Sequence, residues 1–343
     1  MTDNHKAQPA QASKAHTDLT AKPRLIPLAA WPYIQLGRFE RLIGSYLLFW
    51  PCLWGMALAL MHKHKSASTS YDAAPILLLP SLVDLLILAL VFLSGAILMR
   101  GAGCAVNDFF DRKIDAQVAR TASRPLASGK IKPRSALYFI ALLCTLSLLL
   151  MLAALGLGIM NVSAIITAFF ILPLAAFYPL AKRVTRWPQL VLGLAFNWGV
   201  FVGYAALLTP LSGAQGLSLF ALYISGVLWT IGYDTIYAHQ DREDDALLGL
   251  GSTALLFGKH SKALITLFYS AQLAMLATAL WFSGLKGEQI KIFALILPLA
   301  IQLYWQVLRL DIHNPQGCLQ LFRSNNLAGA MIAALLFIAA FIA

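Results

Sequence analysis

The sequence has few charged residues for its length. Lys, Arg, Asp and Glu together make up 12% of the 343 residues, while hydrophobic residues make up 59%. Soluble globular domains contain roughly 25% charged residues, so a soluble domain is excluded. The apolar runs are unbroken, whereas the strands of a membrane β-barrel alternate apolar and polar residues in segments of about ten. The composition therefore predicts an all-α polytopic membrane protein.

Metal-binding cysteine pairs and an apolar leader are also absent. The four cysteines form no C-x-x-C pair, which excludes a zinc site and a disulfide framework. Residues 1–25 are polar, have no apolar core and contain one Arg and two Asp, unlike a secretory signal or an Arg-rich transit peptide. We therefore expect a disordered tail over 1–25 and a single transmembrane domain over 26–343. The tail favours a bacterial inner membrane, with the mitochondrial inner membrane as the alternative.

Nine apolar runs approach the roughly 20 residues that a membrane-spanning helix needs. If the N-terminus is cytoplasmic, 21 of the 26 Lys and Arg residues fall on the cytoplasmic side and four on the other. This positive-inside asymmetry predicts nine spans and a cytoplasmic N-terminus. It also explains the net charge of +11 without nucleic-acid binding, because the basic residues lie in short loops. The predicted spans are roughly 43–62, 82–104, 136–155, 160–181, 189–208, 218–237, 264–284, 291–309 and 326–343.

The chain has only 15 acidic residues, and eight of them lie in two clusters that follow the second and sixth predicted spans. Both clusters fall at the cytoplasmic end of the predicted topology, so they predict two halves of one site. The alternative is that they are ordinary solvated charges paired with nearby Lys and Arg. The first cluster contains Asp108, Asp111 and Asp115, and the second contains Asp234, Asp241, Glu243, Asp244 and Asp245.

The spacing within both clusters suits a divalent cation. If the second span continues as a helix, Asn107, Asp111 and Asp115 follow one another at intervals of four residues and share one face. Asp241 and Asp245 have the same spacing. Carboxylates this close repel one another unless a cation lies between them. Mg²⁺ prefers oxygen ligands and often shares its coordination shell with substrate phosphates. The pattern predicts Mg²⁺ that bridges carboxylates to a phosphorylated ligand.

Basic residues surround the first cluster. Arg100 precedes it, Lys113 lies within it, and Arg120, Arg124 and Lys130 follow. Arg side chains bind phosphate oxygens through paired hydrogen bonds, so these residues could clamp a diphosphate. Each of them could instead serve only to orient the chain in the membrane.

The two acidic motifs with their flanks resemble those of the UbiA-type intramembrane prenyltransferases. "NDFFDRKIDAQVARTASRPLASGKI" resembles the family's first aspartate motif, and "YDTIYAHQDREDDALLGLGSTALLFGK" resembles the second. "GRFERLIGSYLLFWPCLWG" and "YPLAKRVTRWPQLVLGLAFNWG" are similar to the branch that prenylates 4-hydroxybenzoate. The resemblance covers about residues 30–330. One departure is Leu42, where the branch has Pro.

The resemblance implies a bundle of about nine helices around a central cavity near the cytoplasmic face. It implies Mg²⁺-dependent transfer of a polyprenyl group to the ring carbon ortho to the hydroxyl of 4-hydroxybenzoate, a step of ubiquinone biosynthesis. Asp108 fits the motif but is expected to fall off the stripe, and Asp234 or His239 could orient or deprotonate the phenol. The implied metal ligands are Asn107, Asp111, Asp115, Asp241 and Asp245. The residues implied near the diphosphate or the benzoate are Arg100, Lys113, Arg120, Arg124, Lys182 and Arg183, with Arg38 a candidate for the aromatic acid.

Two alternatives remain open. The first is a prenyltransferase of the same family with another aromatic acceptor. The second is a membrane transporter, because carboxylates within a membrane also mark transport paths. The two clusters lie on the same predicted side with four spans between them, so an internal repeat would be parallel. The expected partners are polyprenyl diphosphate, 4-hydroxybenzoate and the lipid bilayer, with no nucleic acid.

Overall fold

The computed structural model describes residues 27–69, 80–118, 121–208, 211–285 and 287–342. The predicted tail over 1–25 and Arg120 lie outside these ranges. Within them the chain is helical without β-strands, and nine helical segments are long and apolar enough to cross a membrane. The protein is therefore a polytopic α-helical membrane protein, as the composition predicted. The orientation of its N-terminus stays a prediction.

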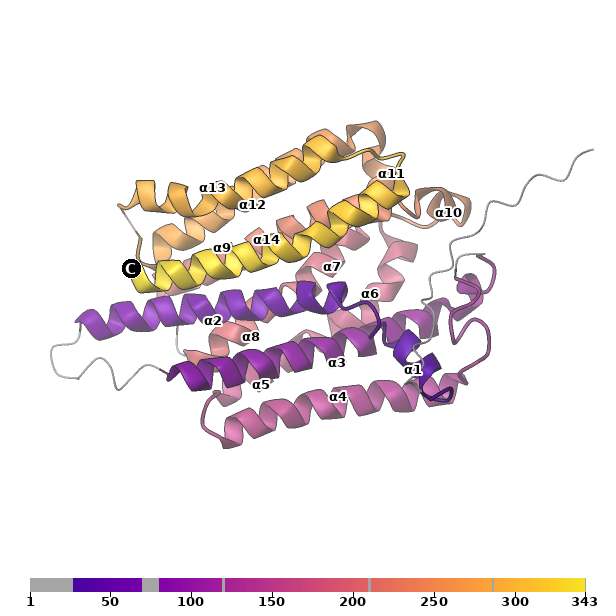
Figure 1. The fold of residues 1–343 in the computed structure, drawn as a ribbon, viewed down its shortest axis with the longest axis horizontal. Helices are drawn as coiled ribbons and strands as arrows, with labels where there is room; N and C mark the ends of the chain where they lie inside the picture. The colour runs from indigo at the N-terminus through magenta and orange to yellow at the C-terminus, as the bar shows by residue number, and fades with distance from the viewer. Residues whose placement is uncertain (1–26, 70–79, 119–120, 209–210, 286, 343) are drawn as a thin grey trace, which may run out of the picture.

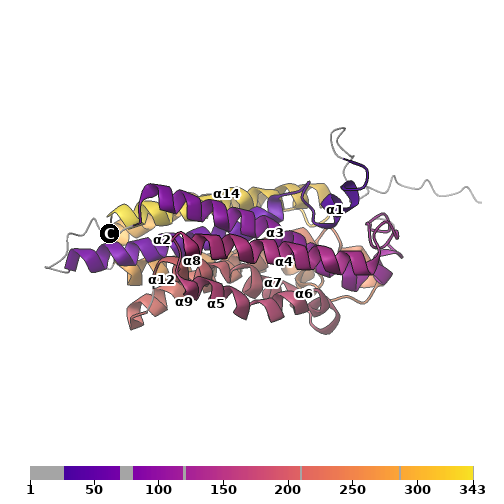
Figure 2. The same cartoon turned by 90° about the horizontal axis from the view of Figure 1, so that it is seen from below.

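The helices run roughly parallel to the long axis of the bundle (Figures 1 and 2). α1, α10 and α11 lie at one end, which we call the aspartate end, and the C-terminus lies at the other. The helices are α1 (Trp31–Leu36), α2 (Ile43–Thr69), α3 (Leu82–Asp115), α4 (Pro133–Gly156), α5 (Val162–Phe170), α6 (Leu172–Val184), α7 (Pro188–Phe196), α8 (Gly199–Leu207), α9 (Gly213–Ala238), α10 (Arg242–Leu247), α11 (Thr253–Phe257), α12 (Ser261–Ser283), α13 (Gln289–Arg309) and α14 (Pro315–Ile342).

Two spans are broken where the sequence disfavours a continuous helix. α5 and α6 meet at Ile171, before Pro173, whose missing N–H is tolerated in the first turn of α6. α7 and α8 are separated by Asn197 and Trp198. The Asn197 amide donates to the carbonyl of Gly193 at 2.9 Å and to the hydroxyl of Thr230 at 2.8 Å. Side-chain hydrogen bonds of this kind allow a broken helix to remain in the membrane.

Glycine allows the closest helix contact in the bundle. A Cβ at Gly55 of α2 would lie 1.9 Å from the carbonyl oxygen of Val200, and a Cβ at Gly203 of α8 would lie 1.9 Å from that of Cys52. Small residues let helix backbones approach in membranes, where dispersion contacts rather than water exclusion stabilise packing. Among the helix pairs, α2 with α8, α9 with α12 and α2 with α14 share the most contacts.

A buried polar cluster joins the helices α9, α12, α13 and α14. The Trp229 indole in α9 and the Gln306 amide in α13 both donate to the Asn325 side chain in α14, at 2.9 and 3.3 Å. The Tyr269 hydroxyl in α12 donates to Gln306 at 2.9 Å. All four side chains are buried. Such bonds add specificity to helix packing in lipid. The other helices, α2 to α8, form most of the cavity wall.

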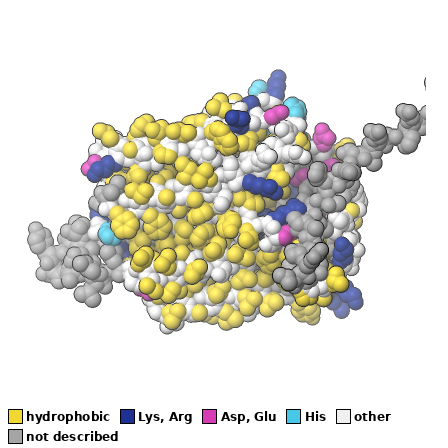
Figure 3. All heavy atoms as spheres, in the orientation of Figure 1, with side chains coloured by type: hydrophobic (Ala, Val, Ile, Leu, Met, Phe, Trp, Pro, Cys, Tyr) yellow, Lys and Arg dark blue, Asp and Glu magenta, His cyan; other side chains and the backbone are white. Residues whose placement is uncertain are grey.

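The surface agrees with a membrane location. In Figure 3 hydrophobic side chains cover most of the visible face, and Lys and Arg gather mainly toward the aspartate end. Leu142, Leu149, Phe170 and Phe293 are among the large apolar side chains exposed on the spans. Exposed apolar area of this extent would destabilise a soluble monomer but matches lipid.

Candidate active site

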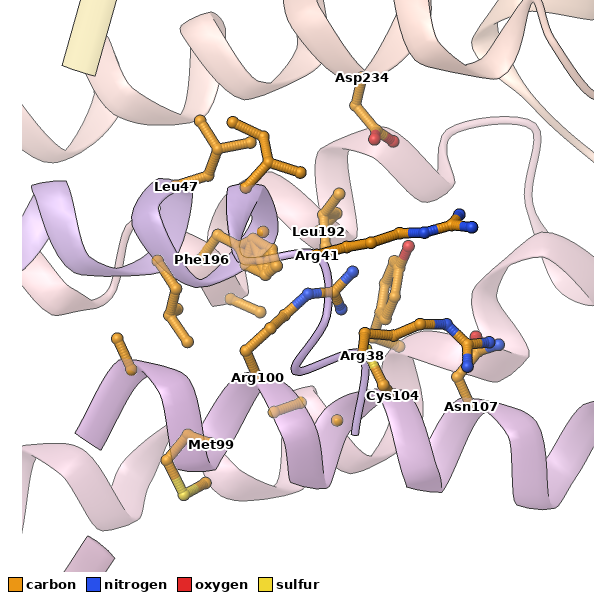
Figure 4. Close-up of a pocket in the computed structure, with 18 of the residues that line it drawn as sticks. Arg38, Arg41, Leu47, Met99, Arg100, Cys104, Asn107, Leu192, Phe196 and Asp234 are labelled. Atoms are coloured by element: carbon orange, nitrogen blue, oxygen red, sulfur yellow. The ribbon is translucent and has the colours of Figure 1, made fainter. Parts of the chain in front are cut away.

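A cavity of about 1540 Å³ opens inside the bundle, lined by α2 to α10 and by the start of α14. Charged and polar side chains line its aspartate end, and apolar side chains such as Leu47, Phe92 and Leu148 line its interior. Figure 4 shows this division: Arg38, Arg41 and Asn107 lie toward one side of the view, and Leu47, Phe196 and Met99 toward the other. A ligand with a polar head and an apolar body fits such a cavity.

The first acidic cluster lies on a continuous helix. α3 runs to Asp115, 11 residues beyond the predicted end of the span at 104, so Asn107, Asp111 and Asp115 do share one face. The Asn107 amide donates to Asp111 at 3.3 Å. Asp108 was expected to fall off this face, and that expectation is wrong: it lines the cavity with Asn107 and Asp115. The reason is that Asp108 lies three residues before Asp111, a spacing that also brings helical side chains together.

Four basic side chains neutralise the first cluster. Lys182 and Arg183 at the end of α6 pair with the two oxygens of Asp111. Arg124, in the loop after α3, pairs with Asp115 at 3.1 Å and with Asp108 at 3.3 Å. Arg38 pairs with Asp108 at 3.1 Å. The three carboxylates are buried, at 0 to 7% exposure, and buried charges need such partners because desolvation is costly.

Arg38 occupies a backbone conformation that normally takes glycine. Its φ is +55°, and it is the described non-glycine residue with a positive φ. The Phe39 amide donates to the Ile34 carbonyl and the Arg38 amide to that of Gln35, which is the Schellman arrangement that ends a helix. Its left-handed position usually holds Gly, because a Cβ there costs about 1 kcal/mol or more. Strain of this kind is typical of functional positions, and here it aims the guanidinium at Asp108.

The second acidic cluster lies on a short turn of helix. Asp241 occupies the N-cap position of the six-residue α10, and the Asp245 amide donates to the Asp241 carbonyl at 2.8 Å, so the two are one turn apart as predicted. Asp241, Asp244 and Asp245 line the same cavity as the first cluster. Residues of both clusters therefore line one cavity, and a shared metal site stays a prediction.

Arg100 and Asp234 lie deeper in the cavity and point into the same space from α3 and α9 (Figure 4). The Arg100 guanidinium lies 5.5 Å from the centre of the Phe196 ring. Gly44 of α2 makes room for it, because a Cβ there would lie 2.4 Å from its Nε. Tyr178 and Tyr237 line the same part of the cavity. This region combines a cation, a carboxylate and phenols next to an apolar wall.

Comparison with known proteins decides the family. The model of the UbiA prenyltransferase family matches residues 48–336. The chain belongs to the UbiA prenyltransferase family. A curated relative, the mitochondrial 4-hydroxybenzoate polyprenyltransferase of Drosophila pseudoobscura pseudoobscura, is 42% identical over 304 residues, which cover 89% of this chain and 69% of the relative. The sequence resemblance to the family is thus confirmed.

Solved UbiA structures share the fold. The apo structure of a UbiA homologue from Aeropyrum pernix K1 aligns with a TM-score of 0.63 at 24% identity, over 85% of this chain and 97% of that one. A UbiA homologue from Archaeoglobus fulgidus, bound to DMAPP and Mg²⁺, aligns with a TM-score of 0.60 at 16% identity, over 91% and 100%. At these identities the similarity shows the fold alone.

The donor set of this UbiA member fits a hard divalent cation. Asn107 and the aspartates of both clusters supply amide and carboxylate oxygens, the ligands that Mg²⁺ prefers. The clusters face one cavity, although among the described residues no three His, Cys, Asp or Glu side chains converge closely enough to hold an ion by themselves. Mg²⁺ usually completes its shell with water and substrate phosphate. Basic side chains at the same end suit that phosphate.

Several predicted site residues lie away from the cavity wall. Asp111 and Arg183 do not line the cavity, and Arg183 instead donates to Asp111 and to the Phe110 carbonyl. Lys113 is exposed and also does not line the cavity. Arg38, named for the aromatic acid, lies beside the first cluster instead. Arg120 falls outside the described residues. The roles of all these side chains stay predictions.

His239 also lies off the cavity wall. It is buried and donates from Nε2 to the Ser261 hydroxyl at 3.0 Å, since that hydroxyl itself donates to the Gly258 carbonyl. Burial, followed by the charges of Arg242 and His313, lowers the pKa of His239 from 6.5 to about 4. This histidine therefore joins the end of α9 to the start of α12, and it does not face the place where an acceptor would bind.

Sequence reasoning missed part of the polar wall. Arg41 precedes α2 and points into the cavity (Figure 4). Gln316, Gln320 and Arg323 lie on one face of α14, which begins 11 residues before the predicted span at 326. Their spacing of four and three residues was a usable signal, because it is the spacing of one helix face. The polar side chains lowered the hydropathy there, so the helix start was placed too late.

Proposed function

We propose that this chain transfers a polyprenyl group from polyprenyl diphosphate to the ring carbon ortho to the hydroxyl of 4-hydroxybenzoate, in ubiquinone biosynthesis. The name of the Drosophila relative, a 4-hydroxybenzoate polyprenyltransferase that is 42% identical over most of the chain, supports this acceptor. The observation that carries the proposal is the division of the cavity into a charged aspartate end and an apolar interior. A diphosphate with a long prenyl tail has the same two parts.

The aspartate end suits the diphosphate. Asn107, Asp111, Asp115, Asp241 and Asp245 would hold Mg²⁺, which when bound would stabilise the negative charge that develops on the leaving oxygen. Basic side chains placed at that end would share this charge, and their effect is large in a site that excludes water. The basic side chains proposed for the diphosphate are Arg38, Arg124, Lys182 and Arg183; Lys113 is exposed away from the cavity, and Arg120 lies outside the described residues.

The deeper polar pair suits the aromatic acid. The Arg100 guanidinium would bind the benzoate carboxylate through paired hydrogen bonds. Asp234 faces the same space and would accept a hydrogen bond from the phenol or take its proton. The adjoining apolar wall, with Phe196 and Trp198, would place the ring beside the prenyl carbon. Phe196 lies under the Arg100 guanidinium, which keeps that side chain directed into the cavity.

The proposed prenyl transfer needs no further reactant, because every bond that breaks is matched by one that forms or by a group that leaves. The C–O bond between the prenyl group and diphosphate breaks, and its electron pair leaves with diphosphate. The ring carbon ortho to the phenol forms the new C–C bond and then loses its proton to a base. The allylic cation that develops needs a site without water, because water would intercept it. The apolar interior supplies this, and aromatic faces stabilise a nearby cation.

The aspartate end would face the cytoplasm or the mitochondrial matrix. The positive-inside distribution of Lys and Arg supports this orientation. The bacterial inner membrane expected from the tail finds no support in the mitochondrial name of the relative, whereas the mitochondrial alternative fits it.

An assay on membranes that contain the protein tests the proposal. With 4-hydroxybenzoate and a polyprenyl diphosphate we expect Mg²⁺-dependent formation of the prenylated acid and none with EDTA. Turnover of a different aromatic in place of 4-hydroxybenzoate would overturn the acceptor but not the prenyl transfer. Equal turnover with and without EDTA would overturn the metal site.

A further inference from the structure

One segment contacts the first acidic cluster and the loop that follows the second. It comprises residues 182–189, from the last turn of α6 to the first turn of α7, and we call it the bridging segment. Its side chains reach the first cluster on α3, and its backbone and Gln189 reach the loop that follows the second cluster. The segment thereby links the six-residue α10, which holds the second cluster, to the 34-residue α3, which holds the first.

The contact with the first cluster is electrostatic. Lys182 and Arg183 pair with the two oxygens of Asp111, and Arg183 also donates to the Phe110 carbonyl at 3.0 Å. Asp111 is fully buried. The bridging segment is therefore fixed to α3 through a carboxylate that has both oxygens engaged.

The contact with the loop after the second cluster is made by two backbone amides of that loop. The Gly251 amide donates to the Lys182 carbonyl at 2.7 Å. Two residues later, the Thr253 amide donates to Oε1 of the buried Gln189 at 3.0 Å. Lys182 thus binds the first cluster through its side chain and the loop of the second through its carbonyl.

Gly251 is required for this contact. A Cβ on Gly251 would lie 2.1 Å from the Thr185 carbonyl oxygen and 3.1 Å from the Arg186 Cα. Both are backbone atoms, so no side-chain rotation would relieve the overlap. The loop would have to move away from the bridging segment to accept even a methyl group.

The connection from Gly251 back to Asp245 is short and hydrogen-bonded. The Leu250 amide donates to the Asp245 carbonyl at 2.9 Å, and the Gly249 amide to the Ala246 carbonyl at 3.4 Å. Gly249 has a φ of +66°, so α10 ends in a Schellman turn with glycine in its usual place. A displacement of residue 251 therefore passes directly to Asp245 and α10.

We propose that Gly251 is a positioning residue that sets the separation of the two metal-binding clusters through its contact with the bridging segment. The inference depends on the proposed metal site and assigns a role to a residue outside it. Residues behind metal ligands typically change metal affinity 10- to 100-fold when replaced. We expect a loss of that size in Gly251→Ala.

Mn²⁺ titration of the purified full-length protein with inorganic diphosphate, followed by electron paramagnetic resonance, measures this effect. Gly251→Ala should bind Mn²⁺ about 10- to 100-fold more weakly, and excess Mg²⁺ should restore its prenyl transfer. Gln189→Leu removes the acceptor of the Thr253 amide and should also weaken Mn²⁺ binding. Gln189→Glu keeps an acceptor and should bind Mn²⁺ more tightly than Gln189→Leu. Gly156→Ala is the matched control, because a Cβ there meets nothing within 4 Å.

The outcomes separate a positioning role from a structural one. Wild-type Mn²⁺ affinity in folded Gly251→Ala, with only a lower unfolding temperature, overturns the inference. If Gly251→Ala does not fold, Gln189→Leu takes its place, and wild-type Mn²⁺ affinity in that variant overturns the inference. If the wild type and Asp241→Asn bind Mn²⁺ equally, the proposed metal site fails and the inference fails with it. If Asp241→Asn loses Mn²⁺ while Gly251→Ala keeps it, only the inference fails.

Discussion

The two acidic clusters carry the same kind of side chain but are held in different ways. The first lies on a continuous helix, and its aspartates are buried and paired with basic side chains from three other segments. The second lies on the six-residue α10, where Asp241 and Asp245 are half-buried, and its loop is fixed by backbone contacts and two glycines. Ion pairs hold the first cluster in place, whereas backbone hydrogen bonds and close backbone packing hold the loop of the second.

Because of this difference, substitutions in the two clusters should affect the stability of the protein to different extents. Ion pairs that neutralise buried aspartates contribute to the folded state before any ligand arrives. Backbone contacts around α10 mainly decide where its carboxylates lie. Substitutions in the first cluster should therefore affect folding and activity together, while substitutions in the second should affect activity more selectively.

The largest expected effect distinguishes Asp111→Asn from Asp241→Asn. Both should lower prenyl transfer by roughly a hundredfold or more, the scale at which lost charge stabilisation acts. Asp111→Asn should also lower the free energy of unfolding by about 1–3 kcal/mol, because Lys182 and Arg183 lose their buried partner but remain partly solvated. Asp241→Asn should lower the free energy of unfolding by less, since Asp241 is only half-buried. Activity and thermal unfolding of both variants, measured without metal, check this contrast.

If the two variants lose the same amount of stability, the clusters do not differ in the way that the ion pairs indicate. Asp84→Asn is a suitable control for the substitution itself, because Asp84 only caps the distant start of α3.

The next effect compares the left-handed turns at Arg38, beside the first cluster, and at Gly249, after the second. Arg38→Gly should relieve backbone strain of about 1 kcal/mol while removing the pair with Asp108, so stability should change little and transfer should fall by about 10- to 100-fold, the range for residues that support metal ligands. Gly249→Ala introduces a Cβ at a φ of +66°, where nothing lies within 4 Å, so its cost is conformational alone, about 1 kcal/mol. Unfolding temperatures and rates of the two proteins measure this.

Arg38→Lys sharpens that result. It keeps the charge but not the planar guanidinium, whose Nη2 donates to both oxygens of Asp108 while Nη1 donates to the Gln35 carbonyl. Full activity in Arg38→Gly would contradict a role for this side chain in the site.

A smaller effect is expected deeper in the cavity, away from both clusters. Gly44→Ala places a Cβ 2.4 Å from the Arg100 Nε, so the side chain must shift. Because the neighbour is a flexible side chain, the fold should tolerate the change. If Arg100 binds the acceptor, the KM for 4-hydroxybenzoate should rise several-fold, roughly 1 kcal/mol of binding, while the metal dependence stays unchanged. An equal rise in the KM for the prenyl donor would instead assign Arg100 to the diphosphate.

The sequence predicted the nine spans, the shared site and the spacing on each stripe, because apolar runs and helical periodicity are local properties. It did not predict the left-handed Arg38 or the close approach at Gly251, since both depend on what another segment places nearby. It also ended the second span at 104 and began the last at 326, because hydropathy falls where a helix continues into a polar cavity. Those two extensions carry the first cluster and Arg323.

Lys113 should have the smallest effect, although the family resemblance places it beside the diphosphate. It lies two residues after Asp111, about 200° around the helix, and is exposed away from the cavity. Lys113→Ala should therefore change kcat/KM less than about twofold, as most surface substitutions do. Arg124→Ala is the matched comparison, because Arg124 comes from the same polar stretch but pairs with Asp108 and Asp115, and it should lose about 10- to 100-fold. Equal losses in the two variants would mean that Lys113 reaches the donor when it binds, and that the loop after α3 rearranges around the first cluster.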